Sequence, residues 1–339
     1  MDYMLLLSAV LGLGLAFALT FPAIKLAPRL GFMDVPKDER RMHTDATPRI
    51  GGAAVFLAFC IAVSVTGHFF ECLGYIVGGL IIVTVGMLDD RYGLRPLVKI
   101  LGQALAGVVL CVFGVSAQFI TLFGITFDLW IFAYPATVIL VIAVTNIVNL
   151  IDGVDGLCTG IAIFGCGAIA LTSFLFSDGA VCAAAITLLC AALGFLPHNA
   201  NPAKTFLGDT GSMFFGFMLT AMLCDSVFAA PTLEGDTLSA LTLLAVLGIP
   251  VFDTGLAIIR RLGNGQSVFE GDKKHVHHQL CAKYGVKVAV VILYGAAAVL
   301  TGIAVLLNIS VAGEIVGAVL LACALVLAYL RFRTKKEEK

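Results

Sequence analysis

The amino-acid sequence predicts an all-α polytopic integral membrane protein with about eleven transmembrane helices. Hydrophobic residues make up 60% of its 339 positions and charged residues only 13%, and the mean hydropathy is +1.03. A soluble domain of this length does not need so much apolar sequence. The apolar residues also occur in separate runs, each able to cross roughly 30 Å of hydrocarbon as a helix. Composition and run length together therefore indicate a membrane protein built of helices.

The apolar runs give the order of the predicted helices. They occupy residues 4–24, 51–67, 70–88, 99–116, 130–150, 157–177, 180–197, 212–230, 238–259, 287–308 and 312–330. The second and third runs are separated only by a short turn around His68 and Glu71. We expect each run to form one membrane span.

Basic residues predict the orientation in the membrane. When the connecting segments are numbered alternately, all 21 Lys and Arg residues fall on the same side. Cytoplasmic loops retain Lys and Arg, so we expect the N-terminus outside and the C-terminus in the cytoplasm. The expected cytoplasmic loops are residues 25–50, 89–98, 151–156, 198–211 and 260–286. Residues 1–331 are expected to form one transmembrane catalytic domain, followed by a charged cytoplasmic tail over 332–339.

The balance and position of charge limit the function classes. The net charge is −1, so there is no basic excess for nucleic acid, and the lipid bilayer is the expected environment. A transporter or flippase of a phosphorylated lipid is the main alternative to an enzyme. Transporters bind near the bilayer midplane and often contain inverted repeats. Here the polar clusters follow the cytoplasmic ends of the spans, and no repeat is evident.

The first loop ends with Arg49, followed by Ile50, Gly51 and Gly52. The two glycines allow backbone to approach a ligand or a neighbouring helix closely. Arg49 is therefore a candidate for binding an anionic substrate. A positive anchor at the start of a helix explains the same residues equally well.

Two adjacent acids, Asp89 and Asp90, end the third predicted span, and Lys99 follows about two turns into the next segment. An acid at the edge of the hydrocarbon indicates function. Adjacent like charges repel, so a site that keeps both supplies a cation or protonates one of them. Asp89, Asp90 and Lys99 are therefore candidate catalytic residues, with a solvated helix end as the alternative.

Four polar residues recur at every third position around the third loop, namely Asn146, Asn149, Asp152 and Asp155. On a continuous helix successive members would be neighbours, whereas the glycines among them predict that the helix breaks and exposes backbone to a ligand. Carboxylate and amide oxygens suit Mg²⁺, which also keeps waters and phosphate oxygens in its shell. A hydrogen-bonded network between helices is the alternative.

The fourth loop contains Lys204 and Phe206 and then Asp209, Thr210 and Ser212 directly before an apolar run. An acid and flexible backbone near a helix N-terminus form a good place for phosphate. The alternative is an ordinary helix start, in which Thr210 or Ser212 caps the helix and Asp209 complements its dipole.

Three of the six histidines, His275, His277 and His278, fall within four positions of the fifth loop, after two lysines and the more distant Asp253. This composition favours a cationic surface that holds phosphate oxygens. A zinc site with Cys281 as a further ligand is the alternative, although ligands this crowded do not easily complete a tetrahedron.

Together the loops offer oxygen ligands for a divalent ion and Lys, Arg and His for phosphate, all at one membrane surface. Two anionic reactants need this mixture, because negative charge must be offset before one phosphate approaches another. The residues therefore predict phosphoryl transfer between a soluble phosphorylated compound and a compound embedded in lipid.

At these motifs the chain resembles the polyprenyl-phosphate N-acetylhexosamine-1-phosphate transferase family, of the glycosyltransferase 4 type. The motifs that carry the resemblance lie at 48–52, 89–90, 149–157, 202–211 and 275–278. The resemblance implies transfer of a sugar 1-phosphate from a UDP-sugar to undecaprenyl phosphate, with release of UMP. It implies Mg²⁺ as the cofactor, with Mn²⁺ as an alternative ion. It also implies a multi-pass protein of the bacterial cytoplasmic membrane whose active site faces the cytoplasm, and it allows a homodimer.

Two branches of this family compete. Arg49 before Ile50-Gly51-Gly52 and the spaced histidines His275, His277 and His278 are more similar to the UDP-GlcNAc branch, which starts teichoic acid, enterobacterial common antigen or O-antigen lipopolysaccharide synthesis. The UDP-MurNAc-pentapeptide branch typically has three consecutive histidines and Met in place of the arginine.

The resemblance also implies roles for single residues. Asn149 and Asp209 resemble the Mg²⁺ contacts, and Asp155 resembles the residue that reads the uracil ring. Asp89 and Asp90 match an acidic pair proposed as a general base or a metal-associated group. The expected phosphate-holding groups are Lys99, His275, His277, His278 and Arg49, and the further candidates for substrate binding are Asn146, Asp152, Lys204 and Phe206.

Overall fold

The computed structural model of the protein describes residues 3–34, 46–175, 179–229, 241–263, 275–310 and 312–322. The predicted tail 332–339, and parts of the first and fifth loops, lie outside these ranges. The helices are α1 (Tyr3–Leu30), α2 (Gly51–Val65), α3 (Leu73–Tyr92), α4 (Pro96–Val112), η1 (Trp130–Phe132), α5 (Ala133–Leu150), α6 (Leu157–Leu175), α7 (Gly179–Asn199), α8 (Gly208–Ser226), α9 (Leu241–Val246), α10 (Gly248–Gly263), α11 (Val276–Tyr284) and α12 (Val286–Leu306). One more helix covers Ala312–Ala322.

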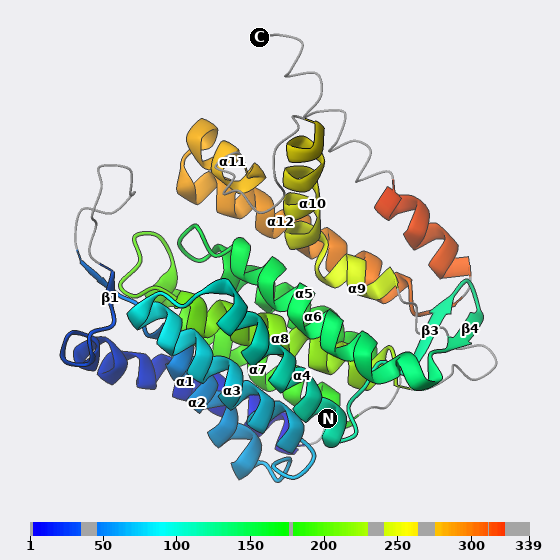
Figure 1. Cartoon of the computed structure of the whole chain (residues 1–339), viewed down its shortest axis with the longest axis horizontal. Coiled ribbons are helices and arrows are strands. Elements are labelled where there is room, and N and C mark those ends of the chain that lie inside the picture. Colours follow the sequence, from blue (N-terminus) through cyan, green and yellow to red (C-terminus); the bar gives the residue numbers. More distant parts are fainter. Residues whose placement is uncertain are drawn as a thin grey trace.

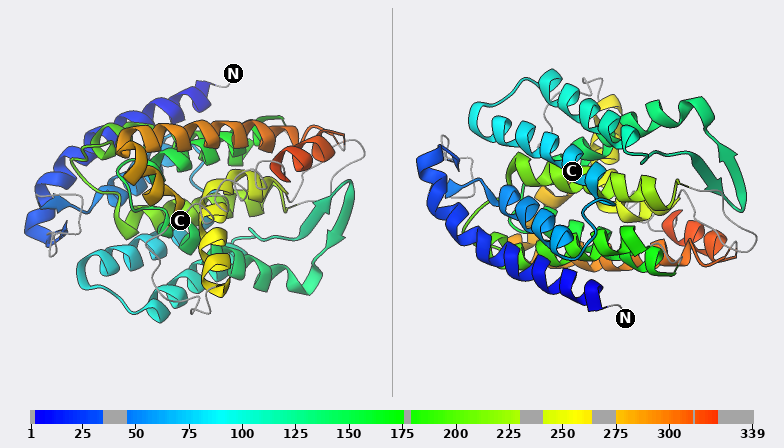
Figure 2. Two further views of the ribbon diagram at one scale, coloured as in Figure 1. Left: turned by 90° about the horizontal axis from the view of Figure 1, so that it is seen from above. Right: turned by 90° about the horizontal axis from the view of Figure 1, so that it is seen from below.

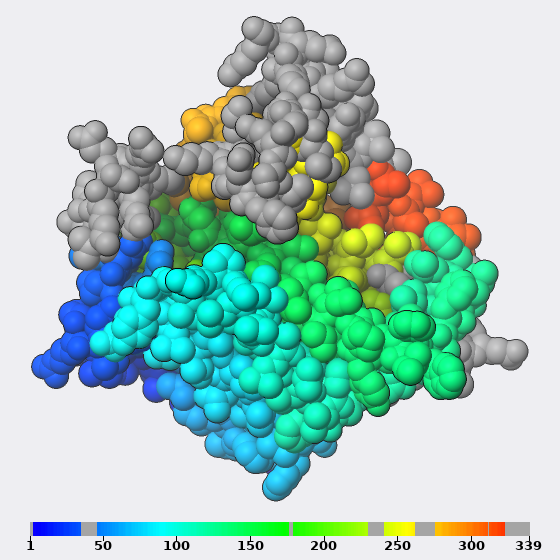
Figure 3. Space-filling model, in the orientation of Figure 1, coloured from blue at the N-terminus to red at the C-terminus, as the bar shows by residue number. Residues whose placement is uncertain are grey.

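Helix is present in every predicted apolar run, which confirms the helical class. Six helices of the described chain are long and apolar enough to cross a membrane. Figure 3 shows α3, α4 and α5 on one face of the molecule. Large apolar side chains that are exposed on α4 and α5 include Leu101, Leu105, Val112 and Ile139. Exposed apolar side chains of this kind suit contact with lipid. The count of eleven crossings and their direction stay predictions.

The predicted ninth span, 238–259, differs from a single straight helix. It contains α9 and α10, which are separated at Leu247. Pro250 follows this break, and a proline ring within a helix lacks an N–H donor and collides with the carbonyl four residues earlier. Figure 1 shows α9 lying along the bundle and α10 turned out of it, beside α11.

Helix α8 forms the centre of the bundle. Its side chains from Gly208 to Cys224 are buried apart from Asp209, and α3, α5 and α2 pack against it. Figures 1 and 2 show the other long helices arranged around it. A helix that is apolar on all sides belongs in a protein interior. The N-terminus of α8, which carries the Asp209 motif, is therefore held on several sides.

Two short hairpins lie at opposite ends of the molecule (Figure 1). Strand β1 (Met33–Asp34) pairs with β2 (Thr47–Pro48) in antiparallel register, and the adjacent Arg49 forms a β-bridge with Phe206 of the fourth loop. Strands β3 (Phe119–Leu122) and β4 (Ile125–Asp128) form the other hairpin, with Leu122 opposite Ile125. Phe123 and Gly124 make its turn with positive φ angles of 51° and 75°, as a two-residue hairpin turn requires.

Candidate active site

A cluster of acids around one lysine lies at the N-terminus of α8. The Nζ atom of Lys99 is 3.0 Å from Oδ2 of Asp89 and 2.5 Å from Oδ2 of Asp209. We call Asp89, Asp90, Lys99, Asn149 and Asp209 the acidic cluster. The lysine offsets the charge of two carboxylates that would otherwise repel each other. The structure thus brings together residues from α3, α4, α5 and α8.

Asp90 has a different environment from its neighbour Asp89. Its side chain is fully buried, and its carboxylate accepts hydrogen bonds from the backbone N–H groups of Asp209 and Thr210 at 2.9 and 3.0 Å. The Thr210 hydroxyl donates a third bond at 2.7 Å. Asp90 therefore caps α8 from another helix, in place of the cap expected from Thr210 or Ser212. These hydrogen bonds hold the backbone of Asp209 in place at the start of α8.

Glycines permit the close approach that this cap requires. A Cβ atom on Gly86 would lie 2.5 Å from the Cα atom of Thr210, and one on Gly52 would collide with the backbone of Gly211. Any larger residue at these positions would push α3 and α2 away from α8. The distance between Asp90 and α8 is thus built into the helix packing.

Asn149 completes the acidic cluster from the end of α5. Its amide donates a hydrogen bond of 2.9 Å to the Ser212 hydroxyl, and its side chain lies beside the Asp209 carboxylate. Two carboxylates and an amide provide the hard oxygen donors that Mg²⁺ prefers. Asp89, Asn149 and Asp209 therefore have the right chemistry to hold a divalent ion, with Lys99 as the cation already present.

The first and fourth loops are joined by backbone hydrogen bonds. The Phe206 N–H donates to the Pro48 carbonyl at 2.8 Å, and Gly51 N–H donates to the Phe206 carbonyl at 3.1 Å. Gly52 N–H donates to the Leu207 carbonyl at 3.0 Å. The Pro48–Gly52 motif is thus a structural partner of the fourth loop, and the two together support the start of α8.

The first-loop arginine contacts acids of the protein itself. The Arg49 guanidinium is 3.5 Å from the Asp34 carboxylate and 3.8 Å from that of Asp90. This arrangement agrees with a structural anchor between β1 and α3. The nearby Lys204 is exposed and Phe206 is half-buried. Substrate binding by Arg49, Lys204 and Phe206 stays a prediction.

The third loop is a turn, as its glycines predict, and not a continuous helix. Helix α5 ends at Leu150, and residues 151–156 turn before α6 begins. Asp155 accepts hydrogen bonds from the Asn201 amide at 2.9 Å and the Ala203 N–H at 3.1 Å. It therefore holds the fourth loop, and its role in reading uracil stays a prediction.

Asp152 lies in the same turn. Burial, followed by the negative charges of Asp209 and Asp90, raises the pKa of its carboxyl to about 8, against a smaller opposite effect of Arg49. A carboxyl that ionises near neutral pH is a common property of functional sites. Substrate binding by Asp152 stays a prediction. Its charge depends on Asp209 and Asp90 of the acidic cluster.

Asn146 lies one turn before Asn149 but makes contacts between helices. Its amide donates hydrogen bonds of 2.7 Å to the Gln103 side chain of α4 and to the Ile142 carbonyl. This is the interhelical network that the sequence left open as an alternative. Substrate binding by Asn146 stays a prediction without support from these contacts.

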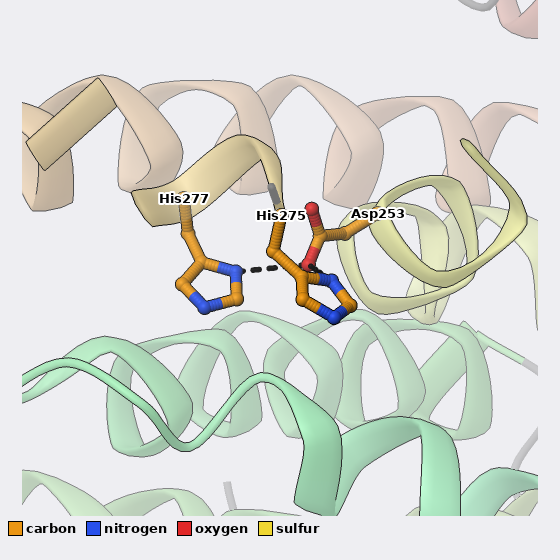
Figure 4. Close-up of side chains that lie close together, drawn as sticks. All are labelled: Asp253, His275 and His277. Atoms are coloured by element: carbon orange, nitrogen blue, oxygen red, sulfur yellow. Dashed lines mark hydrogen bonds and ion pairs between the residues drawn. The ribbon is translucent and has the colours of Figure 1, made fainter. Parts of the chain in front are cut away.

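The histidines form a second cluster, opposite the third-loop turn. The Nδ1 atoms of His275 and His277 are 2.9 and 2.8 Å from Oδ2 of Asp253 (Figure 4). The other oxygen of Asp253 accepts the Val276 N–H at 2.5 Å, at the start of α11. We call Asp253, His275, His277 and His278 the histidine cluster. Asp253, an acid inside an apolar run, is the functional candidate that the motif analysis did not select, although its placement was a usable signal.

The histidine cluster faces the turn that carries Asp152 and Asp155. A Cβ atom on Gly153 would lie 3.3 Å from Nε2 of His277 and 3.5 Å from Nε2 of His278. Burial and then the charges of His277 and His275 lower the pKa of His278. Among the described residues, the acid and nitrogen ligand atoms that come together belong to Asp253, His275 and His277, so the alternative zinc site would not use Cys281 as expected.

Comparison with known proteins identifies the family of the chain. The sequence profile of glycosyl transferase family 4 matches residues 72–227. A probable undecaprenyl-phosphate N-acetylglucosaminyl 1-phosphate transferase of Bacillus subtilis strain 168 is 35% identical over 280 residues, which cover 80% of this chain and 76% of the relative. The chain belongs to glycosyl transferase family 4.

Other members of family 4 support the same branch. The undecaprenyl-phosphate alpha-N-acetylglucosaminyl 1-phosphate transferase of Escherichia coli K12 is 30% identical over 303 residues, covering 86% of this chain and 80% of the relative. The decaprenyl-phosphate N-acetylglucosaminephosphotransferase of Mycobacterium tuberculosis H37Rv is 36% identical over 297 residues, covering 77% and 72%. The family 4 match confirms the predicted family, and these relatives agree with the N-acetylglucosaminyl branch.

Proposed function

We propose that this family 4 transferase moves N-acetylglucosamine 1-phosphate from UDP-GlcNAc to undecaprenyl phosphate with the help of Mg²⁺. The observation that carries the proposal is that the 151–156 turn lies close to both clusters: the charges of Asp209 and Asp90 act on Asp152, and Gly153 lies next to the rings of His277 and His278. One cluster suits a divalent ion and the other suits phosphate oxygens. The names of the relatives supply the lipid phosphate and the sugar.

In the proposed reaction, an oxygen of the lipid phosphate attacks the β-phosphorus of UDP-GlcNAc in line. A new P–O bond forms to the lipid phosphate, the bond between the β-phosphorus and the bridging oxygen breaks, and UMP leaves with that oxygen. The second pKa of a phosphate monoester is near 6, so the nucleophile is already largely dianionic at neutral pH. A general base is therefore of limited use, and alignment and charge compensation lower most of the barrier.

The residues of the acidic cluster divide these tasks. Asp209, Asn149 and Asp89 are placed to hold Mg²⁺, which would neutralise charge on the pyrophosphate and the leaving group. Asp90 keeps Asp209 at the start of α8 through its three hydrogen bonds. Lys99 balances the Asp89 and Asp209 carboxylates, and its ammonium group would bind a phosphate oxygen of the substrates.

The histidine cluster has the second role in the proposed reaction, which is to bind phosphate oxygens. His277 and His278 direct ring nitrogens at Gly153, in the turn between Asp152 and Asp155. Such nitrogens can donate to phosphate oxygens when protonated. We assign this cluster to the uridine diphosphate part of the donor, because the acidic cluster on its own would repel it.

The decisive experiment is release of UMP from UDP-GlcNAc by the purified protein in detergent with undecaprenyl phosphate and Mg²⁺. We expect release to depend on all three additions and to exceed that from UDP-GalNAc and UDP-MurNAc-pentapeptide. Uptake of a phosphorylated lipid into vesicles without any UMP release would instead favour a transporter. Preference for UDP-MurNAc-pentapeptide would move the protein to the other branch.

A further inference from the structure

We propose that Asp253 is a positioning residue that fixes the ring orientation and proton placement of both His275 and His277. One oxygen of its carboxylate lies within hydrogen-bonding distance of the Nδ1 atoms of both rings, at 2.9 and 2.8 Å. A carboxylate can only accept, so Nδ1 must be the donor in each histidine. The proposal rests on the proposed function only for the ligand that the rings then meet.

The contact is well protected from solvent. Asp253, His275 and His277 are 4%, 7% and 2% exposed. A buried carboxylate is costly unless it is paired and hydrogen-bonded, and here the two rings and the Val276 N–H occupy three of its about four acceptor positions. Water is therefore a poor competitor for these bonds, and the rings are held in one orientation.

Fixing Nδ1 determines what the other nitrogen can do. Figure 4 shows the Nε2 atoms of both rings on the side away from the Asp253 carboxylate. The Nε2 atom of His277 is buried, has no hydrogen-bond partner among the described residues, and faces Gly153. A buried ring nitrogen without a hydrogen-bond partner in the described structure, next to a candidate site, is available to bind a ligand.

The chemistry of that ligand follows from the proton count. With Nδ1–H committed to Asp253, an anionic oxygen at Nε2 can be bound only by a second ring proton, and the ring then carries a positive charge. Asp253 provides the adjacent negative charge that balances it. With Asp253 beside it, a histidine ring can carry the positive charge that binds a phosphate oxygen of a nucleoside diphosphate. This charge also offsets the acids Asp152 and Asp155 of the adjacent turn.

The variant Asp253→Asn separates this role from simple support of α11. An asparagine oxygen can still accept the Val276 N–H, but the amide has no charge, and its NH₂ group donates to a ring nitrogen. We expect at least one of the two rings to change to the Nε2–H tautomer. Asp253→Glu keeps the charge and should restore part of the wild-type behaviour.

The test uses ¹⁵N-histidine NMR of the full-length ligand-free protein in detergent, where only six histidines contribute. Single His→Gln variants assign the signals. We expect Nδ1–H for His275 and His277 in the wild type and an altered pattern in Asp253→Asn. Nε2–H in both rings of the wild type would overturn the proposal, and so would one bound zinc per chain by elemental analysis, since Nδ1 would then be a metal ligand.

Kinetics provide the second measurement. Loss of a charge-assisted hydrogen bond should raise the KM for the UDP-sugar by about tenfold or more in Asp253→Asn, with a smaller change in kcat. Asp225→Asn is the matched control, because Asp225 is another acid with a side-chain partner, the Tyr75 hydroxyl at 2.5 Å, outside both clusters. An unchanged KM in Asp253→Asn would overturn the assignment of the UDP-sugar as the ligand that the oriented rings meet. The NMR result is independent of the substrate, so failure of the proposed function would be recognised separately.

Discussion

The acidic cluster and the histidine cluster are both positioned by an aspartate that caps a neighbouring helix, but their side chains suit ligands of opposite charge. In each, an aspartate from one helix accepts backbone N–H at the start of another helix. Asp90 accepts the N–H groups of Asp209 and Thr210 in α8, and Asp253 accepts the N–H of Val276 in α11. The capped helix start then carries the residues that face the site. In the acidic cluster the neighbours are more acids and one lysine, whereas in the histidine cluster they are imidazoles. In both clusters the capping aspartate determines where the helix start lies, and the neighbouring side chains determine which ligand the cluster can bind.

The strongest way to break this comparison is to remove the central acid of the acidic cluster. We expect Asp209→Ala to lower UMP release by about 10³-fold or more, because it removes a carboxylate that would hold Mg²⁺ in the proposed reaction and leaves Lys99 without its nearest partner. The measurement is initial rate at saturating UDP-GlcNAc and undecaprenyl phosphate. Near-normal turnover would remove Asp209 from the site.

A second variant tests the cap itself. Asp90→Asn retains one acceptor oxygen for three donors, so a buried N–H is left unpaired at a cost of about 1–3 kcal/mol. We expect a lower melting temperature and a loss of about 10²-fold in kcat that is the same at every pH. A loss confined to low pH, where the lipid phosphate is monoanionic, would instead indicate a proton-accepting role for Asp90.

The control for Asp90→Asn is Asp128→Asn. Asp128 also accepts a backbone N–H, that of Trp130 at 2.8 Å, but in the exposed β3–β4 hairpin at the other end of the molecule. We expect wild-type kinetics from this variant. Both variants remove an aspartate that accepts a backbone N–H, so a loss seen only in Asp90→Asn is due to its place in the acidic cluster.

A third variant changes the distance between the turn and the histidine cluster. In Gly153→Ala the new methyl group would lie 3.3 Å from Nε2 of His277, which requires the ring to shift slightly. We expect the KM for the UDP-sugar to rise by about two- to tenfold, which corresponds to at most ~1.4 kcal/mol, with kcat little changed. Gly295→Ala, a helical glycine of α12 with open space around it, is the control and should leave KM as it is. Equal KM values in the two variants would argue against contact between the histidines and the donor.

The smallest expected effect concerns stability and pH. Because the folded protein raises the pKa of Asp152 to about 8 from its usual 3.8, folding favours its protonated form. The associated stability is complete below the unfolded pKa and is lost as pH rises toward about 8. Asp152→Asn has no such loss, so its melting temperature in the ligand-free state should gain about 2 °C or more on wild type between pH 6 and pH 9. A constant difference across that range would contradict the high pKa.

The sequence allowed the helical class and most helix positions to be predicted, because hydrophobic runs depend on local composition. The acids near span ends were also predictable, since a charge at the hydrocarbon edge is costly without a function. Their partners were not. Nothing near Asp90 in the sequence indicates that it caps a helix more than a hundred residues away, and Asn146 has the same spacing as its neighbours but contacts Gln103.

The break at Leu247 was missed for a different physical reason. Hydropathy integrates over a window and does not detect one proline, although Pro250 is enough to divide the run into α9 and α10. This bend matters for the site, because Asp253 belongs to α10 and reaches the histidines from there. An acid that hydropathy placed inside a span is thereby part of the histidine cluster.

The backbone pairing between Pro48–Gly52 and Thr205–Leu207 constrains how the protein is made. During synthesis the first partner emerges about 150 residues before the second, and until then the N–H groups of Gly51 and Gly52 lack the carbonyls that they bond in the finished protein. The hydrogen bonds between the first loop and the start of α8 can therefore form only after α7 has been synthesised. Chains that stop before residue 208 therefore contain Asp90 without the helix whose N–H groups it accepts in the complete structure.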